Sequence, residues 1–290
     1  MKLFKIVHKE RLTREVILMK IYAPRIARKA CAGQFVMLRV DDRGERIPLT
    51  IADYDRDAGT VTIIFQTIGC TTNKLSKKEE GDSILDFVGP LGKASDFCDS
   101  KKVLVVAGGL GAAIAYIKVK ELWGRGCDVD VVMGFRNSEL IILEKEMRDV
   151  SSRVFITTDD GSNGNRGYVT DEVSKLLARY EYDLVDVVGP LVMMKAVCDV
   201  TKPYGVRTTV SMNPIMIDGT GMCGGCRLTV DGKVKFACVD GPDFDGHKVD
   251  FDEVIVRNKM YKGYENVATD RYNHECNLHK LSREECDEIE

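Results

Sequence analysis

The spacing of apolar residues changes once along this 290-residue chain, near residue 99. Before that point apolar and polar side chains alternate in short runs such as REVILMKIY and TVTIIFQTI, separated by turn-forming residues, which is the pattern of antiparallel strands. From residue 102 onward, continuous Val and Ile runs such as KKVLVVAGG alternate with helical stretches. That pattern is typical of a parallel sheet covered on both faces. The sequence therefore predicts two domains of different class.

The first domain is predicted over residues 1–98 as a small antiparallel β-barrel. The second is predicted over residues 99–213 as an α/β doubly wound parallel sheet of five strands. A loop rich in cysteine and glycine follows at residues 214–250, and a charged tail without a periodic core occupies residues 251–290. A chain of this length fits two compact domains, and two domains favour a site between them.

Composition limits the partners and the location. A net charge of −3 without a cluster of Lys and Arg argues against nucleic acid. No run of about eighteen apolar residues exists to cross a membrane. The N-terminal residues carry charges throughout, unlike a secretory signal, so the expected location is cytoplasmic. Ten cysteines in such a chain predict metal binding or core positions rather than disulfides.

The segment VLVVAGGLGAA forms a glycine turn between a buried strand and a helix. A turn of this kind lets the backbone approach a ligand, and the helix N-terminus offers free N–H groups to a pyrophosphate. The spacing departs from the full G-x-G-x-x-G pattern, so tight packing is the alternative reason for these glycines. The candidate cofactor-binding residues here are Gly108, Gly109, Gly111 and Ala112.

Three further turns follow the other predicted parallel strands. Arg136 follows the second strand and favours a phosphorylated cofactor, although an exposed loop arginine is equally ordinary. Asp159 and Asp160 follow the third strand and Gly189 the fourth, at the sheet edge where such folds bind ligands. The sequence leaves NAD(H) and NADP(H) both open.

Two segments of the barrel carry polar residues that suit a phosphate. R-I-P-L-T at 46–50 adds a positive charge at a strand start, and Q-T-I-G-C-T-T at 66–72 places a glycine and hydroxyls at a helix start. Either segment alone is more often structural. The candidate residues are Arg46, Pro48, Leu49, Thr50, Gln66, Gly69, Thr71 and Thr72.

Together with G-P-L-G at 89–92 and A-G-G-L-G-A-A at 107–113, these segments resemble the ferredoxin–NADP reductase superfamily over roughly residues 1–250. More narrowly, the chain is similar to the branch containing the iron–sulfur electron-transfer subunit of dihydroorotate dehydrogenase, sulfide dehydrogenase and the small subunit of NADH-dependent ferredoxin:NADP oxidoreductase. The resemblance implies FAD, with Arg46 and Thr71–Thr72 at its pyrophosphate and Pro48–Thr50 beside its isoalloxazine. It also implies that the second domain brings the nicotinamide to that flavin.

Three cysteines in the glycine-rich loop form an incomplete ligand set. Cys223, Cys226 and Cys238 match part of the C-x4-C-x2-C pattern of plant-type two-iron clusters, but the first position holds Asp218. The dihydroorotate branch has cysteine there, whereas an aspartate-ligated [2Fe–2S] cluster is known in the ferredoxin:NADP oxidoreductase branch, which the resemblance therefore favours. A structural zinc held by the cysteines and a residue such as His247 is the alternative, with plain structural cysteines as another.

The resemblance implies a flavin and iron–sulfur electron-transfer subunit that forms a heterodimer with a larger flavin and iron–sulfur subunit. The complex would bifurcate electrons from NADPH to ferredoxin and NAD, with this chain on the NAD branch. No catalytic acid or base is expected, because hydride transfer to a flavin needs none. The alternatives are an electron-transfer subunit of dihydroorotate dehydrogenase or sulfide dehydrogenase, and a nucleotide- or redox-sensing module. In the tail, His274, Cys276 and His279 are interpreted as part of a segment that docks the partner.

Overall fold

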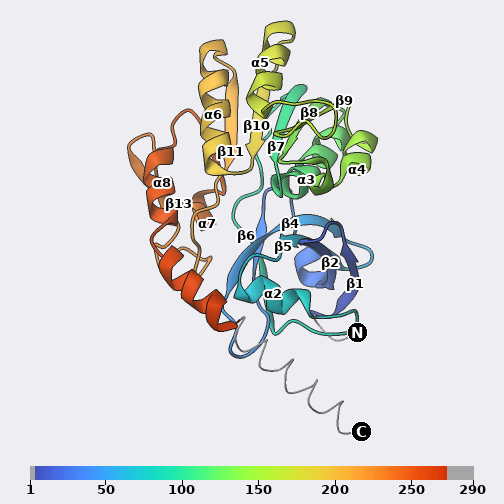
Figure 1. The fold of residues 1–290 in the computed structure, drawn as a ribbon, viewed down its shortest axis with the longest axis vertical. Coiled ribbons are helices and arrows are strands. Elements are labelled where there is room, and N and C mark those ends of the chain that lie inside the picture. Colours follow the sequence, from blue (N-terminus) through green and yellow to red (C-terminus); the bar gives the residue numbers. More distant parts are fainter. Residues whose placement is uncertain (1–3, 273–290) are drawn as a thin grey trace.

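The computed structural model describes residues 4–272. Figure 1 shows a small barrel at the N-terminal end, a sheet flanked by helices above it, and a C-terminal segment that runs along the side of both. His274, Cys276 and His279 lie outside the described residues. No helix among residues 4–272 is long and apolar enough to cross a membrane.

The N-terminal sheet is antiparallel, with strand order β1-β2-β5-β4-β3-β6. A bridge between Lys5 and Ser83 joins the start of the chain to the segment before the last strand, and so closes the barrel. The antiparallel barrel is confirmed. Its elements are β1 (Ile6–Arg11), β2 (Val16–Tyr22), α1 (Pro24–Ala27), β3 (Phe35–Arg39), β4 (Ile47–Asp55), β5 (Thr60–Gln66), α2 (Cys70–Ser76) and β6 (Asp86–Leu91).

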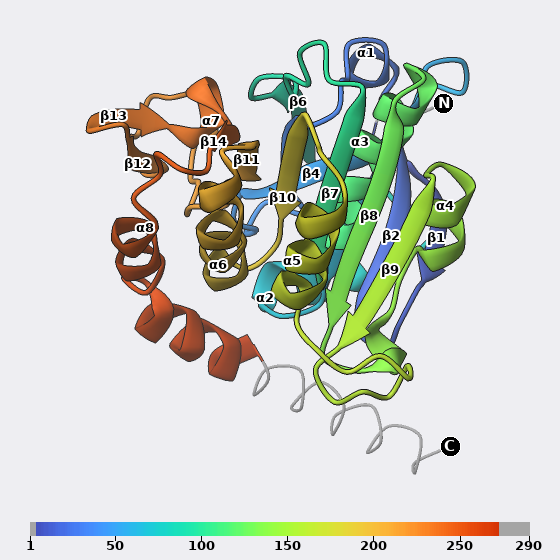
Figure 2. The ribbon, with the colours of Figure 1, turned by 90° about the horizontal axis from the view of Figure 1, so that it is seen from above.

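The second sheet has the order β14-β11-β10-β7-β8-β9. Strands β7 to β11 are parallel, as predicted, and β14 adds an antiparallel edge that the sequence did not indicate. Figure 2 shows α5 and α6 on one face and α3 on the other. The elements are β7 (Lys102–Gly108), α3 (Gly111–Gly124), β8 (Asp128–Phe135), η1 (Ser138–Leu140), α4 (Glu144–Asp149), β9 (Arg153–Thr158), α5 (Val169–Arg179), β10 (Leu184–Val188), α6 (Leu191–Thr201), η2 (Lys202–Tyr204), β11 (Arg207–Ser211) and β14 (Asp243–Asp245).

Burial explains why these runs form a two-sided sheet. Six of the seven residues of β7 and all five of β10 are buried, because helices cover both of their faces. Chain order reverses between β7 and β10, which are neighbours in the sheet, so a crevice opens at their carboxyl ends. The predicted boundary near residue 99 falls in the connection between β6 and β7 and remains a prediction.

The C-terminal region is more ordered than its sequence indicated. A hairpin of β12 (Arg227–Val230) and β13 (Lys233–Phe236) follows the cysteine loop, and α7 (Ala237–Asp240) then leads to β14. Beyond it, α8 (Phe251–Asn258) packs on β12 and α6, and residues 262–272 are also helical. The Asp250 carboxylate caps α8 by accepting the Glu253 N–H. Residues 251–272 were predicted only as a charged tail.

Candidate functional site

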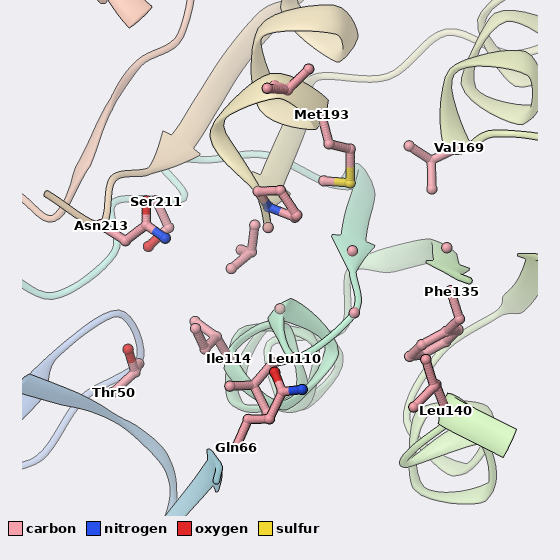
Figure 3. Close-up of a pocket in the computed structure, with 18 of the residues that line it drawn as sticks. Thr50, Gln66, Leu110, Ile114, Phe135, Leu140, Val169, Met193, Ser211 and Asn213 are labelled. Atoms are coloured by element: carbon pink, nitrogen blue, oxygen red, sulfur yellow. The ribbon is translucent and has the colours of Figure 1, made fainter. Parts of the chain in front are cut away.

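A cleft of about 950 Å³ lies between the barrel and the carboxyl edge of the parallel sheet. Its volume is at the upper end of the range of about 300–1,000 Å³ for small-molecule sites. Figure 3 shows Thr50 and Gln66 on the barrel side, Leu110 and Ile114 at the start of α3, and Asn213 beyond the end of β11. The cleft brings together nine of the predicted cofactor residues: Pro48, Thr50, Gln66, Gly108, Gly109, Gly111, Arg136, Asp159 and Gly189.

The glycines of the cleft serve two different purposes. A Cβ on Gly111 would lie 2.3 Å from the Val188 carbonyl oxygen, and one on Gly108 would lie 2.3 Å from the Met193 sulfur. A Cβ on Gly189 would likewise lie 2.7 Å from the Met193 methyl. Gly111 is therefore required for packing, because the close atom belongs to the backbone, whereas at Gly108 and Gly189 the closest atoms belong to the flexible end of Met193. Gly109 has a φ of +55° and open space where a Cβ would point, so its backbone is free to face a ligand.

Three other predicted cofactor residues, Leu49, Arg46 and Ala112, lie outside the cleft lining. Leu49 lies between the cleft residues Pro48 and Thr50 on β4, opposite Val36 of β3. Arg46 is exposed outside the cleft lining, with its guanidinium 3.6 Å from the Asp86 carboxylate. Ala112, in the first turn of α3, is fully buried and also lies outside the lining.

The start of α2 is held by its own side chains. The Thr72 hydroxyl accepts the N–H groups of Ile68 and Gly69, each at 3.1 Å, while Thr71 is buried. Of these residues only Ile68 lines the cleft. A phosphate contact at Gly69, Thr71 and Thr72 therefore remains a prediction.

The far end of the cleft is polar. Arg136 and Asp159 both line it, whereas Asp160 does not and accepts the Ser162 N–H at 2.9 Å. That interaction, together with a hydrogen bond from the Ser162 hydroxyl, lowers the pKa of Asp160. The Thr157 hydroxyl is buried at this end without a hydrogen-bond partner among the described residues. An unpaired buried hydroxyl in a cleft fits a polar ligand, because such groups are normally satisfied.

The cysteine loop brings its predicted ligands to one region. Cys226 and Cys238 are buried with their sulfurs 3.2 Å apart, and Cys223 is exposed. The Asp218 carboxylate accepts hydrogen bonds from the Thr220 N–H at 2.8 Å, the Thr220 hydroxyl and the Met222 N–H. These hydrogen bonds, above all that of the Thr220 side chain, hold the pKa of Asp218 below its usual range.

Backbone amides of the loop point at the sulfurs, as the glycine content predicted. The Gly225 N–H lies 3.4 Å from the Cys223 sulfur, and this contact contributes most to lowering the pKa of that thiol. Burial instead raises the pKa of Cys238 to about 12, against a smaller opposing effect of the Gly221 amide. Amides directed at thiolates are the surroundings that an iron–sulfur cluster uses. The residues present therefore fit such a group.

Zinc fits the loop less well. The His247 ring lies 2.9 Å from the Thr201 hydroxyl at the end of α6, so it is engaged elsewhere. Within residues 4–272, no three His, Cys, Asp or Glu side chains converge on a point where a single metal ion could sit. A two-iron cluster divides its ligands between two metal atoms, whereas a structural zinc needs four around one.

Most of the apolar lining of the cleft is not predicted by the sequence. Leu110 and Phe135 are chain neighbours of predicted residues, and Ile114 lies two residues beyond the predicted Ala112, so closeness in the chain was the available signal. Asn213 and Pro214, just past the last parallel strand, could have been found from the rule that ligands bind at the carboxyl ends of such strands.

Comparison with known proteins places the cysteine loop in a family. Residues 213–250 match the iron–sulfur cluster binding domain of dihydroorotate dehydrogenase B. The chain is 43% identical over 267 residues to the dihydroorotate dehydrogenase B (NAD(+)) electron transfer subunit homolog of Thermotoga maritima, covering 92% of this chain and 94% of that protein. It is 33% identical over 239 residues to the electron transfer subunit of Desulforamulus reducens, covering 80% and 91%.

Solved structures agree with this result. A chain of the NADH-dependent reduced ferredoxin–NADP oxidoreductase matches with a TM-score of 0.89 and 42% identity, covering 94% of this chain and 98% of that one. Phthalate dioxygenase reductase shares only the fold, with a TM-score of 0.59 and 17% identity. These matches confirm the ferredoxin-reductase-like fold with a C-terminal iron–sulfur domain. The chain belongs to the family of dihydroorotate dehydrogenase B electron-transfer subunits.

Proposed function

We propose that this chain passes electrons between NAD(H), FAD and a [2Fe–2S] cluster. One observation carries the proposal: a single cleft is bordered by the barrel strand β4 and by the glycine turn of the sheet, while the cysteine loop packs against the neighbouring strand β3. A flavin in this position would supply the conversion between two-electron hydride transfer and one-electron transfer. In this proposal the protein positions the nicotinamide cofactor, the flavin and the cluster next to one another.

Each group has its own set of residues in this proposal. Pro48, Leu49 and Thr50 lie beside the flavin ring, with Gln66 at the cleft wall. Arg46, Gly69 and Thr71–Thr72 serve the flavin pyrophosphate. The turn from Gly108 to Ala112, with Gly189, receives the nicotinamide cofactor. Cys223, Cys226, Cys238 and Asp218 are the cluster ligands, and the lowered pKa of Asp218 supports an anionic oxygen ligand.

Two opposite charges at the polar end of the cleft bear on the choice between NAD(H) and NADP(H): Arg136 favours the phosphorylated cofactor and Asp159 opposes it. Asp159 lines that end together with Arg136, and a carboxylate there opposes the phosphate that NADP(H) carries on its ribose. In Asp159→Asn, the ratio of NADH to NADPH affinity, measured by titration, is expected to fall. An unchanged ratio would contradict the placement of the adenosine ribose beside Asp159. Asp160→Asn is the matched control, because Asp160 lies outside the lining.

A larger flavin and iron–sulfur subunit is the proposed partner, docking where the cluster reaches the surface. Ile217, Met222 and Val239 are exposed apolar side chains of the cysteine loop, and Met222 is 86% exposed. Such a patch is typical of an interface. Met222→Lys is expected to weaken the complex in a pull-down with the partner, whereas Tyr204→Lys, at an exposed site on η2, should not.

The likeness to the NADH-dependent reduced ferredoxin–NADP oxidoreductase supports the finer role. In that role the complex bifurcates electrons from NADPH to ferredoxin and NAD, and this chain takes the NAD branch in the cytoplasm. The proposed limits remain 1–98 for the FAD domain, 99–213 for the nucleotide domain, 214–250 for the cluster loop and 251–290 for partner docking.

The first test is the content of iron, acid-labile sulfide, zinc and flavin in anaerobically purified protein, with EPR of the reduced state. About two irons and one FAD per chain are expected, as the ligand pattern requires. Asp218→Ala should change the cluster spectrum. Zinc without flavin would overturn the proposal and indicate that the loop is a structural zinc site. Absence of flavin absorbance bands would instead support a nucleotide sensor.

The second candidate function is electron transfer as a subunit of a dihydroorotate dehydrogenase, which the domain match at residues 213–250 favours. The aspartate at position 218 counts against it. Reduction of NAD by dihydroorotate in the purified complex would support this candidate, and dependence on NADPH and ferredoxin would support the first. Reduction of polysulfide would instead indicate a sulfide dehydrogenase activity.

A further inference from the structure

Strand β3 packs on two different cores with its two faces. Val36 and Leu38 belong to the core of the barrel. Phe35 and Met37, which alternate with them, pack instead with the apolar residues of the second core, where Cys226 lies. One strand of the barrel therefore packs directly against the core that contains the cysteine loop.

The closest part of that contact involves a glycine. Gly219, the residue after Asp218, has a φ of +84° and is buried. A Cβ at this position would lie 2.6 Å from the Met37 Cγ and 3.2 Å from the Leu91 Cδ1. The loop backbone thus packs directly against the Met37 side chain, and no side chain larger than hydrogen fits between them.

The same stretch of β3 adjoins the cleft. Phe35 pairs with Thr50 and Met37 pairs with Pro48 across the ladder between β3 and β4. Phe35, Pro48 and Thr50 all line the cleft. Met37 is therefore one strand away from the proposed flavin face on one side and in contact with the cluster loop on the other.

We propose that the contact between Met37 and Gly219 sets the separation of flavin and cluster, and thereby the rate of electron transfer between them. The inference rests on the proposed function and assigns Met37 and Gly219 as positioning residues. The electron count is simple: NADH gives two electrons and a proton to the flavin as hydride. In a single turnover a bound cluster would accept one of these electrons, and the flavin would keep the other electron together with the proton.

The test is Gly219→Ala, followed by stopped-flow with equimolar NADH. Flavin reduction by NADH should stay near the wild-type rate, because the cleft is unchanged. Flavin-to-cluster transfer should slow severalfold, because the rate of electron transfer falls steeply as the distance between donor and acceptor grows. Gly232→Ala is the matched control: it has a φ of +69° in the β12–β13 turn but no atom within 4 Å of a Cβ, so it carries the backbone strain without the contact.

A second variant and a second measurement separate the contact from other causes. Met37→Ala in the Gly219→Ala background gives the added methyl group room, so transfer should partly recover. Hydrogen exchange on cofactor-free protein should rise at residues 216–226 and 35–39 in Gly219→Ala, and only near the hairpin in Gly232→Ala.

Wild-type transfer in Gly219→Ala, equal slowing in Gly232→Ala, or no recovery in the double variant would each overturn the inference. A wild-type protein that binds neither flavin nor iron would overturn the proposed function instead. Hydrogen exchange would still report on the contact in that case.

Discussion

The Nζ of Lys118 lies 2.8 Å from the Oδ2 of Asp243 and 3.0 Å from the Oδ2 of Asp186. Lys118 and Asp186 are buried, on α3 and β10, while Asp243 lies on β14, the strand that follows the cysteine loop. The Thr209 hydroxyl donates a hydrogen bond to Asp186, and the Ser95 hydroxyl donates one to Asp243. The helix that begins at the glycine turn is thereby tied to the strand that returns from the cysteine domain.

Removing the lysine should be costly. In Lys118→Met the buried carboxylate of Asp186 and the partly buried carboxylate of Asp243 lose their cation, and the free energy of unfolding is expected to fall by about 3–5 kcal/mol. Lys120→Met on the same helix is the control, because its pair with Asp53 is largely exposed and worth less than about 1 kcal/mol. Urea denaturation measures both variants. Equal losses would mean that the buried group contributes no more than a surface pair.

Gly109 is the better position for a test of nucleotide binding than Gly111, because Gly111 is needed for packing. Gly109→Glu should weaken NADH binding about tenfold or more, since a carboxylate facing a pyrophosphate costs more than about 1.4 kcal/mol. Flavin content should not change. Gly126→Glu has a similar φ, of +80°, and equally open space, but lies beyond the other end of α3. Calorimetric titration measures the affinity of both variants for NADH. An equal loss of affinity in the two variants would contradict nucleotide binding at the glycine turn.

Alkylation should distinguish the three loop cysteines after iron is removed. Cys223 is exposed and its thiol pKa is lowered by the Gly225 N–H, so it should react with iodoacetamide first. Cys226 and Cys238 are buried, and burial raises the pKa of Cys238 to about 12. Mass spectrometry of partly modified protein measures the order. Reconstitution with iron and sulfide should protect all three, and protection of Cys223 alone would contradict a shared cluster.

Acid should remove one local contribution to stability. The Asp183 carboxylate accepts the N–H groups of Lys102 at 2.9 Å and Lys101 at 2.8 Å, which holds its pKa below its ordinary value of 3.8. A depressed pKa in the folded protein stabilises it above the unfolded value, and this stabilisation is lost as pH falls through the folded value. Asp183→Asn should therefore lower the unfolding temperature near neutral pH.

The same variant should approach wild type only below the depressed pKa of folded Asp183, where the wild-type carboxyl group is neutral in both the folded and the unfolded protein. Thermal scans across the acid range check this convergence. A difference that stays constant with pH would assign the effect to packing. Asp99→Asn, which changes an exposed carboxylate in the connection between β6 and β7, is the control.

Local periodicity was enough to predict both sheets. Alternation in segments such as 16–22 and continuous burial in 103–108 depend only on neighbouring residues, so the barrel, the parallel sheet and their order followed from sequence. The short strand β14 and the helix at 251–258 did not, because their stability comes from packing against β11, β12 and α6, which are distant in the chain.

The sequence by itself determined the two periodicities, the glycine turn and the cysteine spacing that resembles a family. Only the tertiary structure decided that β4 and the glycine turn border one cleft, that Gly109 faces space while Gly111 is needed for packing, and that Lys118 is buried. A lysine in a helix has the same local pattern whether it meets solvent or two carboxylates. The partners come from β10 and β14, and only the folded chain brings these three elements together.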